Sequence, residues 1–204
     1  MENLSTVFEN PVSNATGAAT DGVAVNAYGQ GQCSGVTYTV PAHGDIKVDF
    51  KLKLQCVTPE NVKALDQLIR GMLTASYQKK YDQLTKESKS GGYGFFLFFS
   101  AGGGKTSYSQ TTHTMESYGL DRAQQTKIID AMIKMANQWN TFSYKGEVSN
   151  TEYDYSVSGS LFAIVMDATI QKGEQHTQLR FLGPNVHLKG NDGTSSLPST
   201  GKLY

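Results

Sequence analysis

The chain has 204 residues, a length that suits one domain of ordinary size. It carries 18 basic and 18 acidic residues, so its formal net charge is zero. Proteins that bind nucleic acid normally carry a basic excess, so the overall charge disfavours that partner class. Because a neutral chain does not repel its own copies, the charge leaves self-assembly open.

The start of the chain lacks the basic stretch and apolar stretch of a secretory signal. No segment approaches the roughly 18 apolar residues that a membrane-spanning helix needs. The sequence therefore predicts a cytoplasmic protein by default, with signal-free export as the alternative.

Small and polar residues dominate both ends of the sequence. Residues 1–29 are rich in Asn, Ser, Thr, Ala and Gly without periodicity, and residues 190–204 have a similar composition. Such segments bury too little apolar surface to become ordered by themselves. We therefore expect a flexible N-terminal arm (1–29), a single domain (30–189) and a flexible C-terminal tail (190–204).

The first strong periodic pattern ends near residue 56. From Ile46 to Leu54, apolar residues alternate with polar ones, as in an antiparallel strand with one solvated face. The polar positions are Lys47, Asp49, Lys51 and Lys53. We expect a hairpin that turns at Gly44-Asp45 and pairs this strand with residues 36–40. The lysines are interpreted as a solvated face that protects an edge, in preference to a nucleic-acid contact.

Cys33 and Cys56 flank this hairpin, and they raise the question of a cross-strand disulfide. The apolar faces of the two strands match only if the numbers of paired residues sum to an even value, and the sum for the two cysteines is odd. The pattern therefore disfavours the disulfide unless a bulge shifts the register. The two cysteines lack further Cys or His at ligand spacing, so no zinc site, other metal or cofactor is predicted.

Two segments have the spacing of amphipathic helices. Thr58-Pro59-Glu60 combines an N-cap hydroxyl, a proline at the first helical position and an acid in the first turn, which predicts a helix from 59 to about 85. A second helix is predicted from Asp121, with an apolar stripe that runs through Met132 to Trp139. Two such helices are what a sheet covered on one side needs.

A run of bulky apolar residues between two glycine clusters is the most distinctive segment of the sequence. Phe95-Phe96-Leu97-Phe98-Phe99 follows Gly91-Gly92-Tyr93-Gly94. We expect a strand that is buried on both faces, against the helices or against another subunit. The predicted interaction residues are Tyr93, Phe95, Phe96, Leu97, Phe98 and Phe99.

Two alternatives start from the same run. Residues 92–98 are similar to the RNP1 strand of RNA-recognition-motif domains, whose aromatic side chains stack on bases, although Gly91 stands where that pattern has a basic residue. A membrane-active, pore-forming-like protein is the other alternative, although the run is shorter than a transmembrane strand and does not alternate.

The glycine-rich segment that follows resembles the end of a phosphate-binding loop. Backbone N–H groups in such loops surround phosphate oxygens, but the full pattern needs a glycine where Phe99 stands. Residues 106–113 favour an extended chain over the helix that such a loop precedes. The candidate anion-binding residues are Gly102, Gly103, Gly104, Lys105 and Thr106.

Residues 142–188 have the character of strands. The continuous apolar run Leu161 to Met166 suits a central strand, and Gly173-Glu174 indicates the turn to the next strand. The order of elements along the chain predicts an α+β fold: an antiparallel sheet with two long amphipathic helices packed on one face.

The residues form no recognisable catalytic set, so the sequence leans away from an enzyme. We expect a non-enzymatic interaction or self-assembly protein that buries 93–99 against a partner subunit, in a homo-oligomer or with another protein. The alternatives are a membrane-active protein, a small anion- or nucleotide-binding module that uses the 100–105 loop, and an RNA binder similar to RNA-recognition-motif domains.

Overall fold

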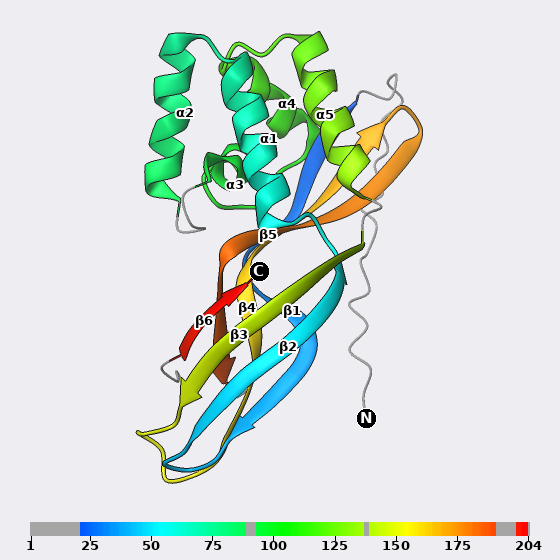
Figure 1. The fold of residues 1–204 in the computed structure, drawn as a ribbon. Helices are drawn as coiled ribbons and strands as arrows, with labels where there is room; N and C mark the ends of the chain where they lie inside the picture. Colours follow the sequence, from blue (N-terminus) through cyan, green and yellow to red (C-terminus); the bar gives the residue numbers. More distant parts are fainter. Residues whose placement is uncertain (1–20, 89–92, 137–138, 191–198, 204) are drawn as a thin grey trace.

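Two antiparallel sheets and five helices make up the computed structural model, which describes residues 21–88, 93–136, 139–190 and 199–203. Sheet A has the strand order β1-β4-β5, and sheet B has the order β2-β3-β6. Sheet A contains β1 (Gly22–Val40), β4 (Val157–Lys172) and β5 (Gln175–Gly190). Sheet B contains β2 (Asp45–Gln55), β3 (Trp139–Ser149) and β6 (Ser199–Leu203). The helices gather at one end of sheet A and sheet B lies at the other (Figure 1), so the predicted α+β class is confirmed.

Sheet A supports two hydrophobic cores, one on each of its faces. Neighbouring residues of a strand point to opposite faces of a sheet. Met166 on β4 packs into the core under the helices, and Val165, its neighbour in the chain, packs into the core against sheet B. The helical layer therefore covers one face of sheet A at one end, and sheet B covers the opposite face at the other end.

The helical layer is built from five segments. They are α1 (Pro59–Met72), α2 (Ala75–Glu87), α3 (Gly94–Phe99), α4 (Tyr108–Ser117) and α5 (Arg122–Ala136). Helix α1 begins as predicted, because the Thr58 hydroxyl accepts a hydrogen bond from the Asn61 amide at 3.1 Å. Helix α5 also begins as predicted: the Asp121 carboxylate accepts from the Gln124 amide at 2.8 Å.

The single helix expected over 59–85 is two helices. The chain is extended at Leu73, whose side chain enters the core, so α1 ends one residue before it. The Gln78 side chain donates to the carbonyl oxygens of Arg70 and Leu73, which satisfies two acceptors at the end of α1. Arg70 also forms two hydrogen bonds with Asp82, and this pair holds α1 and α2 together as a helical hairpin.

Two expected extended segments are helices. The run 93–99 forms α3, a short helix that is apolar on nearly every side and therefore buried. The expected extended segment 106–113 instead enters α4. Helix α4 starts with a capping box: Ser107 accepts from the Gln110 amide, and the Gln110 side chain accepts from the Ser107 amide.

The expected pairing of the hairpin at Gly44-Asp45 is wrong. β1 pairs with β4, and β2 pairs with β3, so the turn between β1 and β2 leads from sheet A to sheet B. His43 has a positive φ of 51° in this turn, and the Gly44 amide donates to the Pro41 carbonyl at 3.2 Å. Apolar alternation cannot distinguish a hairpin from such a corner, because both put the same faces inward.

Parts of the two expected flexible arms are strands. Residues 22–29 form the first part of β1 rather than an arm, and residues 199–203 form β6, which pairs with β3. Residues 1–20 and 191–198 lie outside the described residues. The pairing of the two cysteines stays a prediction, because only the Cys56 side chain, which is buried, is described.

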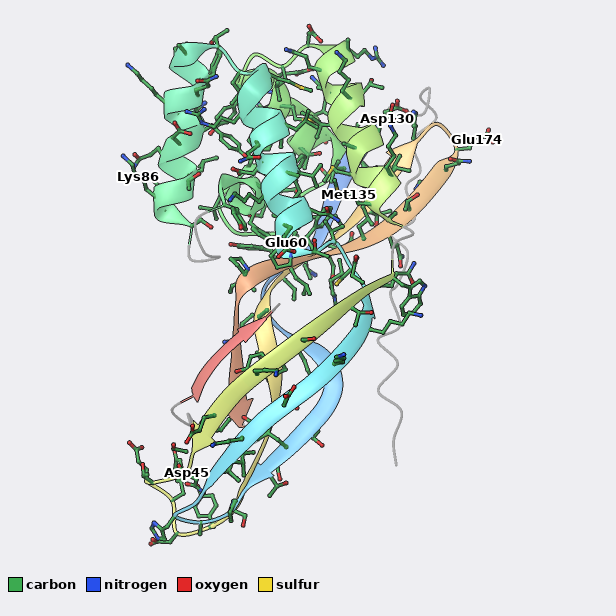
Figure 2. All side chains as sticks on the ribbon, viewed as in Figure 1. Asp45, Glu60, Lys86, Asp130, Met135 and Glu174 are labelled. Carbon is green, nitrogen blue, oxygen red and sulfur yellow. The ribbon has the colours of Figure 1, made fainter. Side chains whose placement is uncertain are left out.

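Two features of the second half are as expected. The run Leu161 to Met166 lies in β4, the central strand of sheet A, and Gly173-Glu174 forms the turn between β4 and β5. The β4–β5 turn and the β1–β2 turn lie at opposite ends of the molecule, where Figure 2 labels Glu174 and Asp45. Trp139, by contrast, is not the end of the α5 stripe; it is the first residue of β3.

Replacing Asn150 by alanine is expected to destabilise the protein by about 2–4 kcal/mol, because several backbone groups lose their partner. The buried amide nitrogen of Asn150 donates to the carbonyl oxygens of Pro41 and Tyr155 at 3.1 and 2.9 Å, and its oxygen accepts from the Tyr153 amide. It thereby joins the β1–β2 turn to the loop before β4. Urea unfolding measures the effect, and Asn150→Asp, which puts a buried carboxylate against the Pro41 and Tyr155 carbonyl oxygens, should destabilise the protein at neutral pH at least as much as alanine does.

Candidate functional site

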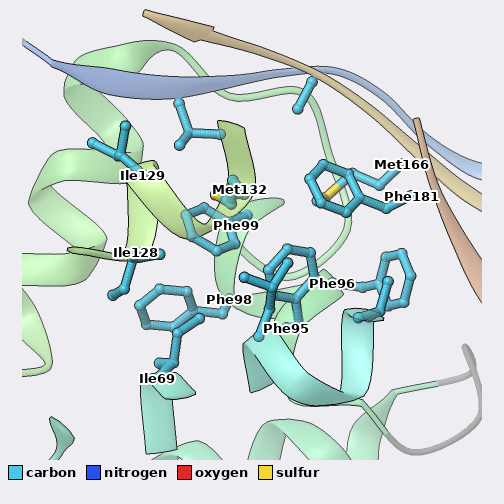
Figure 3. Packing of buried hydrophobic residues seen from close by; sticks show 14 of the residues in the cluster. Ile69, Phe95, Phe96, Phe98, Phe99, Ile128, Ile129, Met132, Met166 and Phe181 are labelled. Atoms are coloured by element: carbon cyan, nitrogen blue, oxygen red, sulfur yellow. The ribbon is translucent and has the colours of Figure 1, made fainter. Parts of the chain in front are cut away.

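The predicted interaction residues lie in the core of the chain itself. Phe95, Phe96, Phe98 and Phe99 are each at most 1% exposed, while Tyr93 and Leu97 are half-buried. Figure 3 shows the four phenylalanines among aliphatic residues of α1 and α5 and beside Phe181 of β5. The Phe95 ring lies 5.0 Å from that of Phe99 and 5.1 Å from that of Phe181. In this conformation the four phenylalanine side chains present almost no surface, whereas Tyr93 and Leu97 remain partly accessible.

A carboxylate fixes the start of α3 within this core. Asp66 of α1 accepts hydrogen bonds from the Phe95 amide at 2.9 Å and from the Tyr81 hydroxyl at 2.7 Å. Burial raises the pKa of Asp66, against the lowering effect of these two hydrogen bonds. Burial, followed by the nearby Asp66 charge, raises the pKa of Tyr81 well above its usual value. The pair has a structural role: it caps an apolar helix that has no polar residue of its own.

The candidate anion-binding loop ends α3 and uses its own N–H groups. The Gly102 amide donates to the Leu97 carbonyl at 3.0 Å, and the amides of Gly103 and Gly104 both donate to the Ser100 carbonyl. The Thr106 amide donates to the Val25 carbonyl, which bridges the loop to β1. Lys105 is exposed. Because the amides that would surround an anion are already engaged, this geometry does not support the anion-binding prediction.

The outer face of sheet B is the most distinctive exposed surface of the described residues. Figure 1 shows β2 and β3 side by side with no described element in front of them. Val48, Tyr144 and Val148 point inward to the core between the sheets, so the alternate positions point outward. We call these outward side chains the lysine face. It consists of Lys47, Asp49, Lys51, Lys53 and Gln55 on β2 and of Trp139, Thr141, Ser143, Lys145 and Glu147 on β3.

The register between β2 and β3 separates the charges of the lysine face into two halves. At the end near the β1–β2 turn, each lysine stands opposite an acid: Lys47 opposite Glu147, and Lys145 opposite Asp49, with 3.3 Å between the Lys145 and Asp49 charged groups. At the end near the helices, Lys51 stands opposite Ser143 and Lys53 opposite Thr141. Two positive charges on this half are therefore not balanced across the strands.

The chain's only tryptophan lies next to one of these two lysines. Trp139 is 60% exposed, and the Lys53 ammonium group lies 5.8 Å from the centre of its ring. The two residues are diagonal neighbours in the ladder, a separation that long and aromatic side chains can bridge. An exposed indole beside unbalanced lysines is an arrangement that can bind a planar, anionic group through stacking and charge together.

Sequence reasoning found only part of this face. The alternating lysines of β2 were correctly expected to be outward, but Trp139 was expected on the apolar stripe of the second helix. Met132 and Ala136 precede it at helical spacing, but α5 ends at Ala136. The sequence does indicate a strand here, because apolar and polar residues alternate from Trp139 to Val148. Phe142, Tyr144 and Val148 are at even-numbered positions, and most of the polar residues are at odd-numbered ones.

No family model matches the chain, and the comparisons with curated proteins and with solved structures found no similar protein. Within the described ranges, none of the helices has both the length and the apolar character needed to cross a membrane.

Proposed function

We propose that this chain is a non-enzymatic binding protein that holds an anionic partner on the lysine face. The observation that carries the proposal is the register of β2 and β3, which leaves Lys51 and Lys53 opposite hydroxyl residues instead of acids. Because the chain as a whole is neutral, this half of the face differs in charge from the average surface. A local field of this kind attracts a partner of opposite charge and orients it.

The proposal moves the expected interaction surface from 93–99 to sheet B. Exposing four phenylalanines from the helical core would cost several kcal/mol for each side chain, which a partner would have to offset. The lysine face requires no such rearrangement, because its lysines and Trp139 are exposed already.

Replacing Lys51 and Lys53 together by glutamate is expected to weaken binding to an anionic polymer at least tenfold, since four units of charge change on the binding half of the face. Binding of inorganic polyphosphate, measured at several salt concentrations, tests this. The control is Lys63→Glu with Lys134→Glu, which makes the same change in net charge on exposed positions of α1 and α5. Equal loss in both variants, or no binding by the wild type, would contradict the proposal.

Self-association through β1 is a second candidate function. β1 is an edge strand of sheet A, and its 19 residues include no charged residue and no proline. Edge strands usually carry such residues, because they prevent pairing with other chains. The register irregularities of β1 at 25–27 and 32–37 bend this edge, so pairing would be confined to short stretches.

Lysine at Thr37, an exposed position of β1, is expected to reduce self-association if the edge mediates it. Sedimentation velocity over a wide concentration range compares Thr37→Lys with wild type, and Thr114→Lys on α4 is the control. A wild-type protein that stays monomeric throughout would remove this second candidate and leave the first unaffected. The same runs with anionic lipid vesicles test the membrane-active alternative.

A further inference from the structure

We propose that the anionic partner is a single-stranded nucleic acid whose bases stack on Trp139 while its phosphates contact Lys51 and Lys53. This inference rests on the proposed function of the lysine face and specifies the chemistry of its partner. It differs from the RNP1 interpretation, which placed the aromatic residues in the segment that now forms the buried helix α3.

The indole of Trp139 is accessible to a nucleobase. Trp139 is 60% exposed although an exposed tryptophan is unfavourable in water, and the Lys53 ammonium group lies over its ring at 5.8 Å from the centre. The exposed part of the indole can contact a planar group. Nucleobases are planar, and stacking of a base on an aromatic side chain is tolerant of sequence, because every base presents a π-face.

A row of positive charges leads away from the indole. Lys51 and Lys53 lie two residues apart on one face of β2, which separates them by about 7 Å along the strand. Trp139 is on the neighbouring strand, diagonal to Lys53. An extended polyanion that follows the strands can thus meet two cations and one aromatic ring in succession, which is the combination that single-strand binders use.

Two hydroxyl side chains lie on the same half of the face. Ser143 and Thr141 stand directly opposite Lys51 and Lys53 and can donate to phosphate or sugar oxygens. Beyond them, Asp49 and Glu147 stand opposite Lys145 and Lys47, so the charges of that half cancel and offer phosphates no net attraction. The geometry therefore limits the contact to a few nucleotides next to Trp139.

Other anionic partners fit these observations less well. A duplex keeps its bases stacked on one another, so its base faces cannot reach the indole. An acidic peptide supplies charge but no planar ring at each unit. An anionic bilayer would attract the lysines, but stable interfacial binding requires more apolar surface than one indole provides.

The test uses the whole 204-residue chain and oligothymidylate, with polyphosphate as an anion that has no bases. Because Trp139 is the only tryptophan, its fluorescence should be quenched by oligothymidylate and not by polyphosphate. The logarithm of the binding constant should fall with the logarithm of salt concentration with a slope of about −1.4 to −2.1, as expected for two or three phosphate contacts. A duplex of equal length should bind more weakly.

The matched variants separate stacking from charge. With a dye-labelled oligothymidylate, Trp139→Ala is expected to bind about tenfold more weakly or worse, Trp139→Phe to recover most of the affinity, and Tyr155→Ala, which removes another exposed aromatic residue, to bind as wild type. Trp139→Ala should leave polyphosphate binding nearly unchanged.

Each outcome decides between the two proposals. Equal affinity for oligothymidylate and polyphosphate without quenching would overturn the single-strand inference and leave the anionic-partner proposal intact. Preference for the duplex or for anionic vesicles would overturn the inference in the same way. Loss of all binding to polyanions would overturn both proposals.

Discussion

Replacing Phe99 by alanine is expected to destabilise the protein by about 3–5 kcal/mol, the range for removing a large aromatic side chain from a core. The side chain is 1% exposed, and its ring lies 5.0 Å from Phe95 and 5.1 Å from Phe98. The loss includes the buried apolar area, the edge and tilted ring contacts and the cavity that remains. Urea or guanidinium unfolding measures the change.

The control for this prediction is Leu97→Ala, because Leu97 belongs to the same helix but is only half-buried. The decrease in the free energy of unfolding should be clearly smaller for Leu97→Ala than for Phe99→Ala. A Phe99→Ala protein that unfolds like the wild type would contradict the burial of α3. If the wild type also forms an oligomer that this variant does not form, 93–99 would be restored as an interface.

Removing the carboxylate that caps α3 is the second prediction with a large effect. Asp66→Ala is expected to destabilise the protein by about 2–5 kcal/mol, because the buried Tyr81 hydroxyl and the Phe95 amide both lose their acceptor. Asp66→Asn keeps an oxygen at the same position and removes a charge that burial disfavours, so it should lie within about 1 kcal/mol of wild type at neutral pH. Comparing the unfolding curves of the two variants tests the assignment.

The pH dependence of folding stability tests the role of Asp66 independently. Because burial raises its pKa in the folded state, the folded protein holds this proton more tightly than the unfolded chain does. Its contribution to stability is fully present below the unfolded pKa of a carboxyl and is lost as pH rises through the folded pKa. Wild type should therefore gain stability relative to Asp66→Asn as the pH is lowered through this window. An opposite slope would show that the hydrogen bonds outweigh burial.

The segment 93–99 illustrates what the sequence can and cannot predict. Its burial was predictable, because five consecutive apolar residues have no solvated face in any regular structure. Its conformation was not, since a short apolar run fits a buried strand and a buried helix equally well. The helical conformation is favoured by the side chain of Asp66, which accepts from the Phe95 amide although the two residues are 29 positions apart in the sequence. Gly94 contributes as well: a Cβ there would lie 3.0 Å from the Thr85 hydroxyl oxygen.

The pairing of the strands is the second feature that could not be predicted from the sequence. The alternation of β2 correctly identified its outward lysines, but the pattern carries no information on which strand lies beside it. With β1 as the partner, the lysines of β2 were a protected edge. With β3 as the partner, Lys47 stands opposite an acid and the other two lysines stand opposite hydroxyl residues. The capping box at Ser107 and Gln110, by contrast, is a local signal from which α4 was predictable.

The most direct test of the role of the lysine face is a titration of the isotope-labelled protein with polyphosphate, followed by NMR shifts of the backbone amides. The proposed function predicts that the shifts concentrate on Lys51, Lys53 and their β3 neighbours Ser143 and Thr141, and that high salt abolishes them. Shifts confined to the 100–106 loop or to the helices, or no shifts at low salt, would contradict it.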